Sequence, residues 1–238
     1  MLEALAARAR GLRHGGERAI LGIAGCPGAG KSTLAELLVR RLAEEGEAVA
    51  LVPMDGFHLA DVALDRLGRR ERKGAIDTFD GDGYLALLRR ARTDLRRTVY
   101  APGFERDLEQ PIAGSIPVDP GVRLVVTEGN YLLADAEPWP LVRAELAEVW
   151  YCELDEAVRR ERLIARHVLF GKSEPEARRW VAAVDDSNAR LIAAGRGKAD
   201  LIVDMAAIGP AERVTVTRRV DVGRDARRGR GGRDERPQ

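Results

Sequence analysis

Five short runs of apolar and β-branched residues recur along the chain, separated by longer segments that mix apolar and charged positions. The runs cover residues 19–24, 48–52, 124–127, 149–154 and 201–203. Because each run is almost continuously apolar, we expect strands that are buried on both faces, as in a parallel sheet covered by helices. The pattern therefore predicts an α/β fold of three layers around a mainly parallel five-stranded sheet.

Several segments between the runs show the apolar spacing of helices. The three clearest faces are Leu34, Leu37, Leu38 and Leu42; Tyr84, Leu87, Leu88, Ala91 and Leu95; and Val158, Leu163, Ile164 and Val168. Residues three or four apart lie on one side of a helix, so each set predicts a helix that packs by that side. Residues 101–121 hold four prolines, and we expect an inserted loop there.

Composition narrows the class of protein. The 238 residues are 45% hydrophobic with a formal net charge of +1, so neither a specific nucleic acid nor a membrane is an expected partner. Residues 223–238 hold six arginines against three acidic residues, and we expect a disordered tail after a single domain over residues 1–222. Two cysteines and no apolar run of about 18 residues predict a cytoplasmic protein without disulfides or a membrane span.

The sequence GCPGAGKST at residues 25–33 follows the first predicted strand directly and opens the first predicted helix. This spacing and this context are those of a phosphate-binding loop, and they predict a P-loop NTPase fold. Backbone N–H groups of such a loop surround a polyphosphate, the lysine reaches the terminal phosphates, and the hydroxyl after it ligates Mg²⁺. Nucleotide contacts are expected from Gly25, Cys26, Pro27, Gly28, Ala29, Gly30, Lys31, Ser32 and Thr33.

Two acidic residues follow the next two predicted strands. Asp55 comes after the second strand and Glu128 after the third. Ligands of open parallel sheets bind beyond the carboxyl ends of the strands, so we expect both carboxylates to face the phosphate loop. One would deprotonate an acceptor hydroxyl and the other would hold the magnesium shell, although a simple turn cap is the alternative at each position.

Four segments, GCPGAGKST, MDGFH, RKGAIDTFD and VVTEGNYLL, occur in the order typical of the uridine kinase, pantothenate kinase and phosphoribulokinase group of P-loop kinases. Residues 19–205 resemble that group, and the wording DGFH and EGNYLL is most similar to its bacterial nucleoside/nucleotide kinase or fructose-kinase-like branch. The resemblance implies that Asp55 is the base toward the acceptor hydroxyl and that Glu128, with Ser32, lies at the magnesium ion.

The same resemblance implies an acceptor site. Acceptor contacts are expected from Asp55, His58, Asp77, Phe104, Arg106, Glu128 and Asn188. Residues 100–106 resemble the acceptor-side loop of the group, in which an aromatic wall and a cation close on a polar small molecule. Arg72 and Lys73 are candidates for contact with an anionic acceptor, and a solvated charge run is the alternative.

Residues 158–167 resemble the arginine-rich lid helix of the group, within a helical lid at about residues 156–190. Arg162 and Arg166 lie four residues apart and share a helical face, so both are expected to reach the transferring phosphoryl group. Arg159 and Glu161 are expected to lie at the surface. A lid of this kind excludes water, which would otherwise accept the phosphoryl group.

These features together predict an ATP-dependent kinase that uses Mg²⁺ and phosphorylates a hydroxyl of a small metabolite, whether a nucleoside, a sugar or a pantothenate-like compound. Lys31, Asp55, Arg162 and Arg166 are the expected catalytic residues. The alternative is a nucleotide-binding module or an NTPase without a small-molecule acceptor. The chain has no Asn-Lys-x-Asp segment, which argues against a GTPase, and a homodimer is left open.

Overall fold

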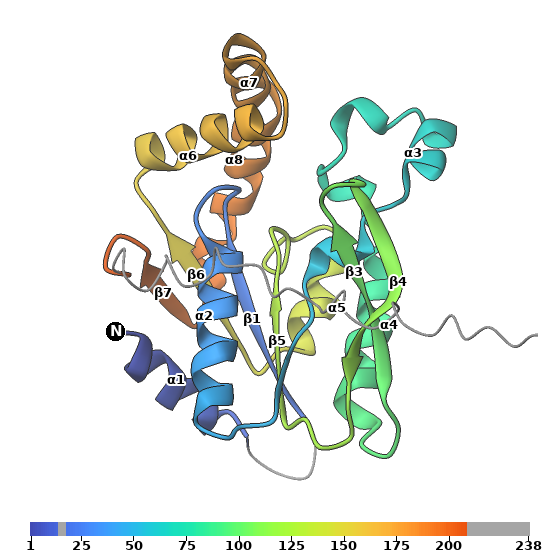
Figure 1. Cartoon of the computed structure of the whole chain (residues 1–238), viewed down its shortest axis with the longest axis vertical. Helices are drawn as coiled ribbons and strands as arrows, with labels where there is room; N and C mark the ends of the chain where they lie inside the picture. The colour runs from blue at the N-terminus through green and yellow to red at the C-terminus, as the bar shows by residue number, and fades with distance from the viewer. Residues whose placement is uncertain (14–17, 209–238) are drawn as a thin grey trace, which may run out of the picture.

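The computed structural model describes residues 1–13 and 18–208, and the predicted tail at 223–238 lies outside them. Its main sheet has five strands in the order β2-β5-β1-β6-β7 (Figure 1). The strands are β1 (Ala19–Gly25), β2 (Val49–Leu51), β5 (Leu124–Glu128), β6 (Glu148–Glu153) and β7 (Leu201–Asp204). All four pairings are parallel, which confirms the predicted sheet, and β2 is shorter than predicted.

Helices cover both faces of this sheet. The α-helices are α1 (Leu2–Gly11), α2 (Lys31–Glu44), α3 (Asp61–Leu67), α4 (Gly81–Thr93), α5 (Trp139–Ala144), α6 (Glu156–Leu169), α7 (Glu174–Trp180) and α8 (Asp186–Ala194). Short 3₁₀ turns are η1 (Met54–Phe57), η2 (Arg70–Arg72), η3 (Ile76–Thr78) and η5 (Arg196–Lys198), and η4 (Val181–Asp185) is a π-helical turn. None of the helices in the described ranges has the length and apolar character needed to cross a membrane.

The side chains of the strands alternate between two cores. Leu21 and Ile23 of β1 pack with α1 and α2, whereas Ile20 and Ala24 pack with α4, α5 and α8. The predicted face of α2 is fully buried, and so are the Tyr84, Leu88 and Ala91 positions of α4. Leu95 lies beyond the end of α4. The three-layer prediction is thereby confirmed.

The predicted loop at 101–121 is wrong, because most of it is an antiparallel hairpin. Strand β3 (Val99–Glu105) pairs with β4 (Gln110–Val118) as a separate two-stranded sheet. Each strand of such a hairpin has a free edge, where the missing N–H of a proline costs no ladder hydrogen bond. Pro102 lies where the register shifts between Ala101 and Gly103.

Helix α6 packs differently from its predicted face. Val158 and Val168 are 43% and 42% exposed, and the buried residues are Arg159 and Leu163. The helix rises above the carboxyl edge of the sheet and returns through α7 and α8 (Figure 1), so only a narrow stripe of it meets other elements. The predicted lid segment thus corresponds to α6, α7, η4 and the start of α8, and its function as a lid stays a prediction.

Candidate functional site

The phosphate loop joins β1 to α2 in a conformation that favours glycine. Gly28 and Gly30 have φ of 81° and 101°, in the left-handed region, and Gly30 is the N-cap of α2. A Cβ on Gly28 would lie 2.8 Å from Cγ of Leu163 in α6. The first N–H groups of α2 have no partners within the helix, so the loop and the helix terminus together form an anion-binding site.

Lys31 and Ser32 begin α2 and face the end of β5. Lys31 is only 8% exposed, and its Nζ donates to the carbonyl oxygen of Cys26 at 3.2 Å. The Ser32 hydroxyl donates to Oε1 of Glu128 at 3.0 Å. A buried ammonium and a hydroxyl–carboxylate pair beside the phosphate loop and the N-terminus of α2 fit the phosphates and the Mg²⁺ of a nucleotide.

Glu128 is the last residue of β5 and is 5% exposed. Burial and the nearby charge of Asp55 raise the pKa of Glu128 to about 7, and the charge of Lys31 opposes this shift. Asp55 lies in η1, four residues beyond the end of β2, rather than directly at the strand end. Because β2 and β5 are neighbours, the two carboxylates meet at the carboxyl edge of the sheet, as expected from the sequence.

His58 packs beside Asp55 in an aromatic setting. Its Nε2 lies 4.0 Å from Oδ1 of Asp55, and its ring centroid lies 4.0 Å from that of Phe79 and 5.0 Å from that of Phe104. Burial lowers the pKa of His58 to about 4, so the ring is neutral near pH 7. Its buried Nδ1 has no hydrogen-bond partner among the described residues.

The hairpin brings two predicted acceptor residues to the same place. Phe104 stacks on His58, and Nη2 of Arg106 lies 3.7 Å from Oδ2 of Asp55. The backbone approach behind this arrangement is close, since a Cβ on Gly56 would lie 2.2 Å from the carbonyl oxygen of Pro102. Glycine at 56 therefore lets the hairpin pack directly on the turn that carries Asp55.

Three other predicted acceptor residues, Asp77, Arg72 and Lys73, form ion pairs within the protein. Asp77 is paired with Arg72 and lies 3.4 Å from Nε of Arg69, while its Oδ1 is buried without a hydrogen-bond partner in the described part of the chain. Lys73 donates to Oδ1 of Asp61 at 2.7 Å. Arg72 and Lys73 are thus neutralised by carboxylates.

The predicted surface position of Arg159 is wrong. Arg159 is 4% exposed, and its guanidinium donates to the Pro27 carbonyl at 3.3 Å and to Oδ1 of Asp186 at 2.9 Å. It therefore connects the phosphate loop to α6 and α8. Its spacing of four residues from Leu163 is the sequence signal that places both on the buried face of α6.

The two predicted lid arginines lie on α6, with Arg162 half-buried and Arg166 more exposed. Desolvation by the surrounding atoms lowers the pKa of Arg166, and the charge of Arg106 lowers it further. The charges of Asp185 and Asp55 act in the opposite direction and raise this pKa. Arg166 is thus within electrostatic range of both Arg106 and Asp55.

Asn188 is half-buried on α8, and the carbonyl of its neighbour Ala189 accepts from Sγ of Cys26 at 3.5 Å. This contact places this part of α8 at the phosphate loop.

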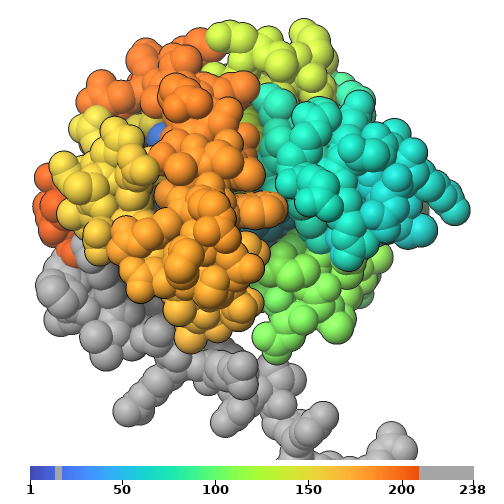
Figure 2. Space-filling model, turned by 90° about the horizontal axis from the view of Figure 1, so that it is seen from above, coloured from blue at the N-terminus to red at the C-terminus, as the bar shows by residue number. Residues whose placement is uncertain are grey.

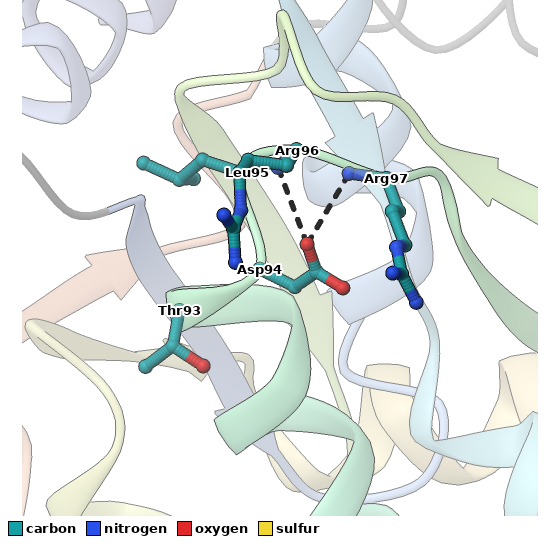
Figure 3. A pocket seen from close by; sticks show the side chains of 5 residues that line it. All are labelled: Thr93, Asp94, Leu95, Arg96 and Arg97. Carbon is teal, nitrogen blue, oxygen red and sulfur yellow. Dashed lines mark hydrogen bonds between the residues drawn. The ribbon is translucent and has the colours of Figure 1, made fainter.

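A separate hollow of about 420 Å³ lies at the turn between α4 and β3 and is lined by residues 93–97 (Figure 3). Asp94 accepts the backbone N–H groups of Arg96 and Arg97 there, each at 3.2 Å. The end of α4 contacts the residue before β1, since Arg18 N–H donates to the Arg92 carbonyl. The hollow is therefore at the amino edge of the sheet, opposite the phosphate loop. Its carboxylate, that of Asp94, stabilises the turn through these two hydrogen bonds.

Seen from above, α6 to α8 in yellow and orange lie on one side of the molecule, with the α3 segment in cyan and the hairpin in green on the others (Figure 2). Asp55 in η1 and Glu128 at the end of β5 lie at the carboxyl edge of the sheet. The phosphate loop thus lies against α6 and α8, whereas η1 and the hairpin bring His58, Phe104 and Arg106 together beside Asp55. The arrangement provides an anion-binding loop with a carboxylate and a cation next to it.

Known proteins are similar to this chain in sequence and in fold. A family model described as methylmalonyl-CoA mutase-associated GTPase MeaB matches residues 3–60, the segment that contains the phosphate loop. The chain is 36% identical over 161 residues to a Schizosaccharomyces pombe protein named a putative uridine kinase, covering 65% of this chain and 68% of that one. It is 37% identical over 125 residues to an ATP-dependent kinase-like protein of Aspergillus versicolor, covering 50% and 73%.

A solved structure is similar over most of the molecule. The putative fructose transport system kinase from Silicibacter superposes with a TM-score of 0.79 and 35% identity, over 85% of this chain and 98% of that one. The YFH7 protein of Saccharomyces cerevisiae, described as a P-loop kinase with a circular permutation, has a TM-score of 0.71 at 21% identity and supports the fold alone.

Proposed function

This chain belongs to the P-loop kinases related to uridine kinase, and we propose that it transfers the γ-phosphoryl group of ATP to a hydroxyl of a small metabolite. The observation that carries the proposal is the meeting of Asp55 and Glu128 beside Lys31 and Ser32. Hydrolysis of a nucleotide needs only water, whereas an aromatic wall and a cation next to the base provide a surface for an organic acceptor.

The residues divide into two groups by role. The loop amides, Lys31 and the N-terminus of α2 bind and orient the phosphates. Ser32 and Glu128 would hold Mg²⁺, which supplies positive charge against the phosphate oxygens when bound. Glu128 must be ionised for this task. Its pKa is raised to about 7, and the positive charge of a bound cation would favour the ionised form.

The proposed chemical step is an in-line displacement. Asp55 accepts the proton of the acceptor hydroxyl while the hydroxyl oxygen forms a bond to the γ-phosphorus and the bond to the ADP oxygen breaks. Arg162 and Arg166 on α6 stabilise the charge on the transferred group. Neutral His58 orients the acceptor or the Asp55 carboxylate without competing for the proton.

The test is an ATP-consumption screen over nucleosides, pantothenate, ketohexoses and pentose phosphates, with the Lys31→Ala protein as the blank. Once an acceptor is found, Asp55→Asn is expected to lower kcat by about 10²- to 10⁴-fold, the usual contribution of a general base, while the Kd for ATP stays nearly unchanged. Equal losses of turnover and ATP affinity would contradict the assignment of Asp55 as the base. ATP binding with no turnover on any hydroxyl compound would favour the nucleotide-binding alternative.

A further inference from the structure

The cations around Asp55 differ in how far carboxylates already neutralise them. Arg72 and Lys73 form ion pairs with Asp77 and Asp61. Among the described residues, the one ion-pair contact of Arg106 is with Asp55 at 3.7 Å, which is longer than a hydrogen bond, and its side chain is 49% exposed. A guanidinium that served only to fix Asp55 would pair with it bidentately at about 2.8 Å. Arg106 therefore keeps donors available beside the base.

The position of Arg106 is set by the fold rather than by its own side chain. The close approach of Gly56 to Pro102 seats the hairpin on η1, and Phe104 packs against His58 two residues before Arg106. In both contacts, the η1-side residue, Gly56 or His58, is close to Asp55 in the sequence. The hairpin residue, Pro102 or Phe104, is close to Arg106. The carboxylate and the guanidinium thus lie side by side, and the guanidinium keeps hydrogen-bonding capacity.

Arg106 comes from the hairpin, a different part of the fold from the phosphate loop between β1 and α2. The phosphates already have Lys31, the loop amides and the α2 terminus, and Arg166 approaches from α6. A carboxylate or phosphate group that bound Arg106 while the acceptor hydroxyl bound Asp55 would lie at most about 9 Å from that hydroxyl, from the 3.7 Å contact and two ordinary hydrogen bonds. Compact hydroxy acids and sugar phosphates meet this limit.

We propose that Arg106 binds an anionic oxyacid group of the acceptor, so that the substrate is a small hydroxy acid or a sugar phosphate rather than a neutral alcohol. This inference rests on the proposed function and names its acceptor class. His58 is uncharged near pH 7, and Lys73 and Arg72 are already paired, so Arg106 is the acceptor-side cation in the described part of the chain with the most donors left for a substrate anion. The neutral wall of Phe104 and His58 then packs against the carbon skeleton.

The test uses matched pairs of acceptors that differ by one charge: pantothenate and pantothenyl alcohol, gluconate and gluconamide, ribulose 5-phosphate and ribulose, fructose 6-phosphate and fructose. Two pairs probe carboxylates and two probe phosphates. The purified full chain is assayed with ATP and Mg²⁺ as wild type, Arg106→Gln and Arg106→Lys. Arg89→Gln is the matched control. Arg89 lies on α4, is 53% exposed and pairs with one carboxylate, that of Glu145.

The wild type is expected to prefer the charged member of at least one pair. Arg106→Gln should raise the KM for that acceptor by about 10- to 150-fold, the value of a charge-assisted hydrogen bond, and should leave the KM for ATP and the rate with the neutral member nearly unchanged. Arg106→Lys should recover part of the loss, since it keeps the charge without the planar fork. Arg89→Gln should behave as the wild type.

Three results would overturn the inference in different ways. Faster turnover of the neutral members would refute the anionic acceptor and leave the kinase proposal intact. An equal fall of kcat on both members of each pair, with unchanged acceptor KM, would assign Arg106 to the base or the transferred phosphoryl group instead. ATP hydrolysis without any phosphorylated acceptor would overturn the proposed function and this inference with it.

Discussion

Replacing His58 with phenylalanine tests the electrostatic description of the acceptor side. The ring of His58 lies between Phe79 and Phe104, its side chain is 11% exposed, and its Nδ1 has no hydrogen-bond partner among the described residues. Phenylalanine preserves the stacked ring and removes the group that titrates. The variant therefore isolates the free-energy cost of keeping a neutral imidazole in this environment.

The magnitude follows from the difference between the two pKa values of His58. Its pKa is about 4 in the folded protein, against an ordinary value of 6.5. Because the folded pKa is the lower one, the unfolded chain binds more protons between pH 6.5 and 4. Stability is fully present above pH 6.5 and is lost as the pH falls toward 4. At 1.36 kcal/mol per pKa unit, the wild type loses about 2 kcal/mol between pH 7 and pH 5 through this residue.

The assay is urea unfolding at half-unit steps from pH 7.5 to 5, with the free energy of unfolding of the variant compared with that of the wild type at each pH. Groups that titrate alike in both proteins cancel in the difference, so the variant should gain about 2 kcal/mol relative to the wild type as the pH falls from 7 to 5. His167→Phe is the control histidine on α6. Parallel curves for wild type and His58→Phe would refute the buried, neutral state of His58.

Two further predictions concern the contacts that hold the site together. Gly56→Ala places a Cβ 2.2 Å from the Pro102 carbonyl oxygen, a backbone atom that cannot rotate away, so it should lower the free energy of unfolding by about 1–3 kcal/mol and raise the acceptor KM. Gly121→Ala meets no atom within 4 Å and is the control; similar urea curves for both would contradict the packing argument. Arg159→Met should cost about 1–3 kcal/mol and weaken ATP binding, because the Pro27 carbonyl and Asp186 lose a buried donor. Arg160→Met, which removes a 45% exposed partner of the same Asp186, should change ATP binding little, and equal effects of the two would show that Arg159 has no special link to the loop.

The sequence was sufficient for features whose local pattern has one structural solution. The phosphate loop is specified by its spacing and by the strand and helix around it, and α2 by its four leucines. The adjacency of Asp55 and Glu128 followed from strand ends in a parallel sheet, although Asp55 lies in a 3₁₀ turn beyond the strand. The loop and α2 depend on residues close together in the chain, and the adjacency of the two carboxylates depends on the parallel pairing of β2 with β5, so the pattern is sufficient for each.

Features that depend on distant contacts could not be predicted in the same way. Prolines normally break strands and therefore predict a loop at 101–121, and only the position of the hairpin as a separate two-stranded sheet makes them harmless. The burial of Arg159 depends on the absence of a side chain at Gly28, 131 positions away in the sequence. Arg72 pairs with Asp77, and its contact with an anionic acceptor stays a prediction.

The two halves of the site are attached to different parts of the fold, and this separates the effects that substitutions should have. Arg159 links the phosphate loop to α6 and α8, whereas the Gly56–Pro102 contact links η1 to the hairpin. A change in the first contact should therefore act on ATP, and a change in the second should act on the acceptor. The backbone of Asp55 belongs to the acceptor half of the site, next to Gly56. Its charge acts on the nucleotide half, because it raises the pKa of Glu128. Asp55→Asn should therefore lower that pKa, while its main loss should fall on turnover of the acceptor rather than on ATP affinity.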